Sequence, residues 1–170
     1  MKLIKTYEQH NYDLDMINRN QMGNELIYYC SKKSALNHTR KLLSEGADPN
    51  FENNIGRSPL HYACTNFLVN VVKLLIENGA DVNKKSKENI TPFFMLSTYA
   101  HSYSYIKNKI KINKIIDLLI ENGANISIKA INNVFFDEMA HKDFIDHIKV
   151  NHPKEYEEFL MVKEAEKYNL

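Results

Sequence analysis

Two successive runs of apolar residues in the middle of the chain repeat at positions i, i+3 and i+4, which is the spacing of one face of an α-helix. The runs are Leu60, Ala63 and Cys64, followed by Val69, Val72, Leu75 and Ile76. The pattern therefore predicts two short amphipathic helices in succession. Because two short helices cannot bury their apolar faces alone, we expect copies of this unit on either side.

Polar and special residues mark the ends of these predicted helices. Ser58 supplies an oxygen suited to an N-cap, and Pro59 suits the first turn because the N–H it lacks would be unpaired there. Gly79 stands where a left-handed residue ends the second helix. The first helix is therefore expected to begin near residue 58 and the second to end just before Gly79.

The five glycines of the chain fall on one repeating grid. Gly23 and Gly56 are 33 residues apart, as are Gly46 and Gly79, and Gly123 lies 44 residues beyond Gly79. We expect Gly23 and Gly56 to occupy tight turns with positive φ before a first helix, and the other three to end a second helix. The sequence thus predicts an all-α solenoid of repeated helix pairs.

The stretch from Gly56 to Ser86, GRSPLHYACTNFLVNVVKLLIENGADVNKKS, resembles one ankyrin repeat. Ser-Pro-Leu-His opens the first helix, Val-Val-Lys-Leu-Leu-Ile lies in the second, and Gly-Ala-Asp-Val-Asn follows it. The resemblance implies stacked helix-turn-helix units with hairpin-like loops. It also implies that His61 hydrogen-bonds within its own turn, with Ser58 as the partner.

We interpret the chain as one ankyrin-repeat domain with three full repeats and worn units at both ends. The divisions are an N-terminal cap at 1–19, repeats at 20–52, 53–85 and 86–129, and a degenerate repeat with a capping helix at 130–170. The first repeat lacks the proline start, and Asn89 replaces the loop glycine of the third, which is tolerable because Asn visits the left-handed region more readily than most residues. In the degenerate repeat we expect helices over 136–140 and 144–148, then a final helix from Pro153.

Eleven extra residues interrupt the third repeat, most simply at 100–110 between its two helices. The segment and its flanks carry three tyrosines and several basic residues, and repeat architecture does not require them. Two interpretations stay open: the insertion recognises a partner, or it lengthens one of the two helices by two or three turns.

Composition indicates a soluble globular protein. Hydrophobic residues make up 44% of the chain, charged residues 25%, and the net charge of +1 gives no general attraction to nucleic acid or an anionic membrane. No apolar run is long enough for a signal peptide or a membrane span. We expect an intracellular, cytoplasmic protein, with a secreted effector or a viral protein in a host cell as further options. Cys30 and Cys64, in equivalent places of two repeats, are expected to be buried and reduced.

No motif of enzymatic chemistry is present in the sequence. Phosphate loops, GxSxG elbows, HExxH helices and CxxC pairs are all missing, so we predict no enzyme activity and no cofactor. His61 and Cys64 are disfavoured as metal ligands because the repeat pattern uses His61 in a hydrogen bond. The irregularly spaced His141, His147 and His152 are interpreted as surface residues. No metal site is predicted.

The resemblance implies a monomeric adaptor or inhibitor that binds a protein partner through its concave face and loop tips, and a host–pathogen role fits that use. The positions that vary on such a scaffold are Gln21, Met22, Asn24, Lys32 and Lys33 in the first repeat, Asn54, Ile55, Arg57, Thr65, Asn66 and Lys85 in the second, and Lys87, Glu88, Ile90, Thr98 and Tyr99 in the third, with Tyr103 and Tyr105 in the insertion. Arg57 and Tyr99 are the leading candidates, because Arg and Tyr dominate many interfaces.

Two alternatives are kept. Lysines at 84–87 and within 99–114, interleaved with tyrosines, could contact nucleic acid, although the near-neutral net charge argues against it. Asn83 follows Asp81-Val82 at the position where asparaginyl hydroxylases modify some ankyrin domains, so the chain could be a substrate of such an enzyme.

Overall fold

The computed structural model describes the backbone of residues 2–32, 35–99, 102–126 and 138–167, and the side chains of 15–32, 35–98, 107–126 and 142–165. All regular structure in these residues is helical. The helices are α1 (Lys2–Cys30), α2 (Leu36–Ser44), α3 (Pro59–Thr65), α4 (Val69–Glu77), α5 (Pro92–Tyr99), α6 (Ser102–Glu121), α8 (Glu138–Asn151) and α9 (Pro153–Lys167).

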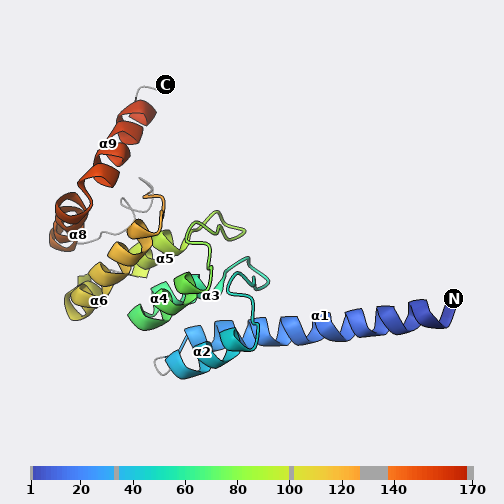
Figure 1. Ribbon diagram of the computed structural model, residues 1–170. Helices are drawn as coiled ribbons and strands as arrows, with labels where there is room; N and C mark the ends of the chain where they lie inside the picture. The colour runs from blue at the N-terminus through green and yellow to red at the C-terminus, as the bar shows by residue number, and fades with distance from the viewer. Residues whose placement is uncertain (1, 33–34, 100–101, 127–137, 168–170) are drawn as a thin grey trace.

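The helices stack in two layers (Figure 1). The end of α1 packs on α3 and α3 packs on α5, while α2 packs on α4 and α4 packs on α6. Irregular segments join α1–α2 to α3–α4 and α3–α4 to α5–α6, and these two segments project from one side of the stack (Figure 1). The predicted all-α repeat solenoid is confirmed.

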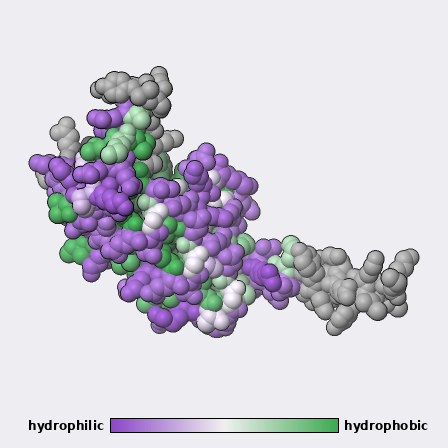
Figure 2. All heavy atoms as spheres, turned by 45° about the horizontal axis from the view of Figure 1, so that its top comes forward, coloured by the Kyte–Doolittle hydropathy of each residue, from purple (hydrophilic) through white to green (hydrophobic). Residues whose placement is uncertain are grey.

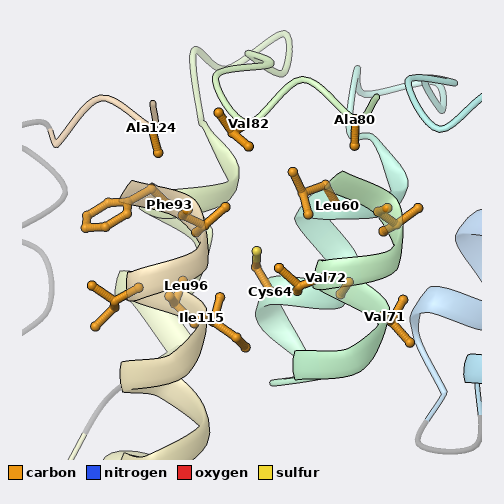
Figure 3. Close-up of a cluster of buried hydrophobic side chains, with 14 of the residues drawn as sticks. Leu60, Cys64, Val71, Val72, Ala80, Val82, Phe93, Leu96, Ile115 and Ala124 are labelled. Carbon is orange, nitrogen blue, oxygen red and sulfur yellow. The ribbon is translucent and has the colours of Figure 1, made fainter. Parts of the chain in front are cut away.

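The apolar faces predicted from the sequence meet in the centre of this stack. Leu60, Cys64, Val72 and Ile115 have no exposed surface and point toward one another between the layers (Figure 3). Burying one side chain of the size of Leu or Val contributes about 1.5 to 3 kcal/mol. Repetition of such contacts from one repeat to the next holds the solenoid together.

The predicted helix ends are present. Ser58 and His61 form a capping box at the start of α3, and Pro59 is the first helical residue. Gly46, Gly79 and Gly123 have positive φ after the ends of their helices. The loop residue Gly56 has φ of +75°, and Asn89, its equivalent one repeat later, has φ of +58°.

The prediction of a turn at Gly23 is wrong, and the segment assigned to the N-terminal cap at 1–19 continues without a break into the same helix. One helix, α1, runs from Lys2 to Cys30 through Gly23, which does not have positive φ. Gly23 serves another purpose: a Cβ there would lie 2.2 Å from the ring of Phe51. The glycine therefore lets an aromatic ring rest on the helix backbone. The N-terminal part of α1 extends past α2 (Figure 1).

The insertion in the third repeat lengthens its second helix. The outer helix α4 has 9 residues, whereas its counterpart α6 has 20 and begins at Ser102. Among the described side chains of α6, which begin at Lys107, Ile112 is the first that is fully buried in the core. The structure thus agrees with the helix-lengthening interpretation, and Ile110 on the extension is 74% exposed.

The C-terminal region differs from the expected helix pair. Instead of separate helices over 136–140 and 144–148, a single helix, α8, spans Glu138–Asn151. Phe144 and Ile148 on it are fully buried, and α8 packs against α6. The helix α9 begins at Pro153 as predicted and buries Phe159, whereas Leu160 and Val162 are exposed.

Candidate functional site: the loop tips of the second and third repeats

The loop before α3 is folded by the side chain of Asn53. Its Oδ1 accepts hydrogen bonds from the backbone N–H of Ile55 at 3.1 Å and of Arg57 at 3.0 Å, while its Nδ2 donates to the Tyr62 hydroxyl at 2.7 Å. The backbone N–H of Gly56 donates to Asn53 O at 2.8 Å. One asparagine side chain therefore fixes the whole turn.

Ser86 has the same role one repeat later. Its Oγ accepts from the backbone N–H of Glu88 at 3.2 Å and of Ile90 at 3.3 Å, and its carbonyl accepts from Asn89 N–H at 2.9 Å. The two loops thus use different residues, an amide and a hydroxyl, for one geometry.

The two tips are joined to each other. The backbone N–H of Lys87 donates to Ile55 O at 3.1 Å, and the Arg57 guanidinium pairs with the Glu88 carboxylate at 3.2 Å. Gly56 permits this approach, because a Cβ on it would lie 2.8 Å from the backbone nitrogen of Lys87. The neighbouring tips therefore form one connected unit.

We call Asn54, Ile55, Arg57, Lys87 and Glu88 the loop-tip surface. The Ile55 side chain is 42% exposed although it is large and apolar. Asn54, Lys87 and Glu88 are exposed, whereas Arg57 is half-buried. The surface thus presents one apolar residue surrounded by charges of both signs, and Figure 2 shows mostly polar residues over the projecting loops.

His61 supports the loop-tip surface from below. The backbone N–H of Ser58 donates to its Nδ1 at 3.1 Å, so the ring carries its proton on Nε2, which lies 2.8 Å from Ile90 O and donates to it. The Ser58 bond needs the neutral ring, whereas the bond to Ile90 O favours the charged ring and raises its pKa. Burial, the largest influence, lowers the pKa of His61 below its usual range, and the charge of Arg57 lowers it further. The predicted bond to Ser58 is confirmed, and the ring also joins the second repeat to the third loop.

Asn50 and Asn83 form a second connection between repeats. The Asn50 side chain donates to Gly79 O at 2.8 Å and accepts from Asp81 N–H at 2.7 Å. Asn83 repeats the pattern with Gly123 O and Asn125 N–H, both at 2.8 Å. A hydroxylase acting on Asn83 would therefore have to release both of these bonds.

Several other predicted binding residues lie outside the loop-tip surface. Gln21, Met22 and Asn24 lie in the interior of α1 and not in a turn around Gly23. Thr65 and Asn66 lie at the far end of α3, about 10 Å from its start.

The remaining candidates are scattered. Lys32 and Lys85 are exposed, while Ile90 and Thr98 are half-buried. Tyr99 ends α5, and Tyr103 and Tyr105 are near the start of α6, but the side chains of all three lie outside the described residues, as does Lys33 altogether.

The lysines of the nucleic-acid alternative divide into two groups. Lys84 pairs with Glu52 beside the loops, and Lys109 pairs with Asp143 of α8. Lys107 lies 14 residues before the end of α6, which places it about 20 Å along the helix from the loop side. Ion pairs and separation both weaken the case for one basic surface.

Sequence reasoning missed a cluster at the other end of the molecule. His147 and His152, which the sequence analysis interpreted as surface residues, turn inward and both contact Asp117 of α6. Only 15% of the His147 side chain and 9% of the His152 side chain are exposed, so the surface interpretation is wrong. His141 lies where side chains are not described. No local motif signals the cluster, because Asp117 precedes the histidines by 30 and 35 residues.

Repeated helix pairs, a continuous core and projecting loops joined to one another define a helical-repeat binding scaffold. A family model for ankyrin repeats matches three copies, with matches over residues 2–86 and 26–130. The chain therefore belongs to the ankyrin repeat family, whose members are generally protein–protein interaction modules and typically lack enzymatic activity. A search among proteins of curated function found no match. Within the described residues, none of the helices is long and apolar enough to cross a membrane.

Proposed function

We propose that this protein is an adaptor or inhibitor that binds a protein partner through the loop-tip surface. The observation that carries the proposal is the joining of the two tips by the Lys87–Ile55 backbone bond and the Arg57–Glu88 ion pair. A surface that is already ordered loses little conformational freedom on binding, which favours affinity. Ile55 supplies an apolar anchor, and Lys87 and Glu88 supply charge complementarity.

Arg57 has a supporting part in this proposal. Its guanidinium holds Glu88, and its Nε is buried without a hydrogen-bond partner among the described residues. Changing Arg57 would therefore disturb the shape of the surface as well as its chemistry. Ile55 and Lys87 are better positions for testing recognition, because both side chains point to solvent.

The test compares two double variants of the full chain in affinity capture from a cell lysate followed by mass spectrometry. The variant I55A/K87E alters the loop-tip surface, whereas K73A/E77A alters an exposed pair on α4. We expect the first variant to lose the proteins that the wild type captures and the second to keep them, with equal far-UV circular dichroism. Identical capture by the wild type and I55A/K87E would refute the proposal.

A deletion of residues 100–110 separates the loop-tip surface from the α6 extension. The shortened α6 would keep residues 111–121, close to the length of α4, and would retain the buried Ile112. We expect partner capture to persist. If capture is lost while helicity is kept, recognition belongs to the extension with Tyr103 and Tyr105.

The two alternatives have direct tests. Retention on a DNA column that falls steeply with salt would favour nucleic-acid binding through Lys85, Lys87 and the α6 lysines, and flow-through at low salt would exclude it. Addition of one oxygen atom to the intact mass after treatment with an asparaginyl hydroxylase, absent in N83A, would establish Asn83 as a substrate.

A further inference from the structure

We propose that Asp117, His147 and His152 form a binding site for one divalent transition-metal ion of the zinc type. The three ligand atoms, one carboxylate oxygen and one nitrogen of each ring, all lie within 4.8 Å of one another. Two imidazoles and one carboxylate are ligands that Zn²⁺ takes in proteins. We call these three residues the α6–α8 triad.

The fold builds the triad from three separate elements. Asp117 is on α6, His147 is near the end of α8, and His152 is the single residue between α8 and α9. Its backbone N–H donates to Ile148 O at 2.7 Å, and Pro153 begins the next helix. The backbone of His152 is thus held at the corner between the two helices.

The ligand atoms already converge. The Nε2 atoms of His147 and His152 lie 2.7 Å and 2.8 Å from the same oxygen, Oδ1 of Asp117. Ligands around a tetrahedral Zn²⁺ with bonds of about 2.1 Å are about 3.4 Å apart. An opening of about 0.6 Å at each hydrogen bond would therefore admit the ion. Solvent can supply the fourth ligand, because 33% of the Asp117 side chain is exposed.

When both rings are neutral, metal binding moves the proton of each ring from one nitrogen to the other and releases no proton to solvent. In the hydrogen-bonded state each ring donates its Nε2–H to Asp117, and in the metal-bound state Nε2 binds the ion and the proton moves to Nδ1. The Asn151 amide nitrogen lies 3.2 Å from Nδ1 of His147, so this side chain must turn to present its oxygen. With the charge of the ion and one carboxylate counted together, the metal-bound site has a net charge of +1.

The ion would fasten the C-terminal helices to the last full repeat. Phe144 and Ile148 are fully buried on the face of α8 that packs against α6, and the triad lies at the end of that face. Because the ligands come from both sides of the α6–α8 contact, the ion binds the folded chain and stabilises it as its concentration rises.

The test uses Zn²⁺ itself as the probe and the full-length protein. We expect isothermal titration calorimetry to show one site, and the midpoint of thermal unfolding to rise with Zn²⁺ and return to its starting value with a chelator. Mg²⁺ at equal concentration should give neither effect, because it prefers six oxygen ligands. Absence of both Zn²⁺ effects in the wild type would overturn the proposal and leave the triad as a hydrogen-bonded contact.

Variants locate the site. H147Q keeps an N–H that can donate to Asp117 but removes the imidazole, and we expect it to weaken Zn²⁺ binding by more than about 10-fold, since even lost supporting contacts cost about 10- to 100-fold. D117N should do the same. The matched control is H38Q, which changes an exposed histidine stacked on Tyr29 of α1. Equal affinity in wild type and H147Q would place the ion elsewhere and refute the assignment. The comparison of wild type with H147Q decides the assignment even if D117N fails to fold.

Discussion

Substituting Gly56 and Gly79 by alanine separates two effects that glycine has in this fold. Both residues have left-handed backbones, with φ of +75° and +84°. Nothing lies within 4 Å of a Cβ built at Gly79, whereas a Cβ at Gly56 would be 2.8 Å from the backbone nitrogen of Lys87. G79A therefore reports backbone strain alone, and G56A reports strain plus the separation of two loops.

The magnitudes follow from these contacts. An alanine in the left-handed region costs about 1 to 2 kcal/mol, which is the expected loss for G79A. G56A should also lose the 3.1 Å hydrogen bond from Lys87 N–H to Ile55 O, worth about 0.5 to 1.5 kcal/mol. We thus expect a total loss of about 1.5 to 3.5 kcal/mol in the free energy of unfolding.

Urea unfolding followed by circular dichroism measures the two losses, and amide hydrogen exchange follows the proton of Lys87. We expect faster exchange of that proton in G56A and unchanged exchange in G79A. Asparagine variants add a control, because Asn tolerates positive φ, as Asn89 does here. G79N should be nearly neutral, while G56N should retain the steric loss. Equal losses for G56A and G79A with unchanged Lys87 exchange would refute the reasoning.

Three further predictions concern polar groups of the repeats. The lowered pKa of His61 means that below about pH 6.5 the unfolded chain binds a proton that the folded chain does not, so stability should fall with decreasing pH by up to about 1.4 kcal/mol per unit. H61Q, which keeps a capping residue, should show a shallower slope in urea unfolding across pH 5 to 8. Burial raises the pKa of Cys30 to about 12 and that of Cys64 still further, so both thiols should resist iodoacetamide at pH 8 until urea unfolds the chain. N83A should lower the unfolding free energy by about 0.5 to 1.5 kcal/mol for each of the two exposed hydrogen bonds that it removes, to Gly123 O and from Asn125 N–H; an unchanged urea midpoint would contradict that role.

Features set by residues close in sequence were predictable. The capping box of Ser58 and His61 spans three residues, and a proline in the first turn marks its position. The positive φ of Gly56, and of Asn89 at the equivalent position of the next repeat, follows from the repeat grid. Such signals act within one turn of chain, so spacing alone identifies them.

Features set by contacts between distant segments were not predictable in the same way. Gly23 matches the grid, yet it lies inside α1, where the ring of Phe51 occupies the space that a Cβ would take. The α8 helix has no residue that breaks it between 138 and 151, so two expected helices are one. The sequence order of Asp117 and His152 gives no sign that they meet, because that contact depends on how α8 lies against α6.

The loop-tip surface could be anticipated only in part, for the same reason. Ile55, Arg57, Lys87 and Glu88 were all among the residues predicted to bind. What the sequence could not indicate is that they are joined pairwise across two repeats, which makes Arg57 a support for Glu88. Variable positions read from a repeat pattern are treated as independent residues, whereas the ion pair makes Arg57 and Glu88 one unit.

The loop-tip surface and the α6–α8 triad lie at different interfaces and should act independently. The loop-tip surface joins repeats 53–85 and 86–129 through Ile55 and Lys87. The α6–α8 triad joins α6 to α8 through Asp117. The contacts that define the two share no residue, so we expect their effects on stability to add within about 0.5 kcal/mol. The double variant G56A/H147Q, measured by urea unfolding without metal, should show the sum of the two single losses. A coupling of 1 kcal/mol or more would mean that the stacked repeats transmit strain from one interface to the other, and binding at the tips would then respond to the metal.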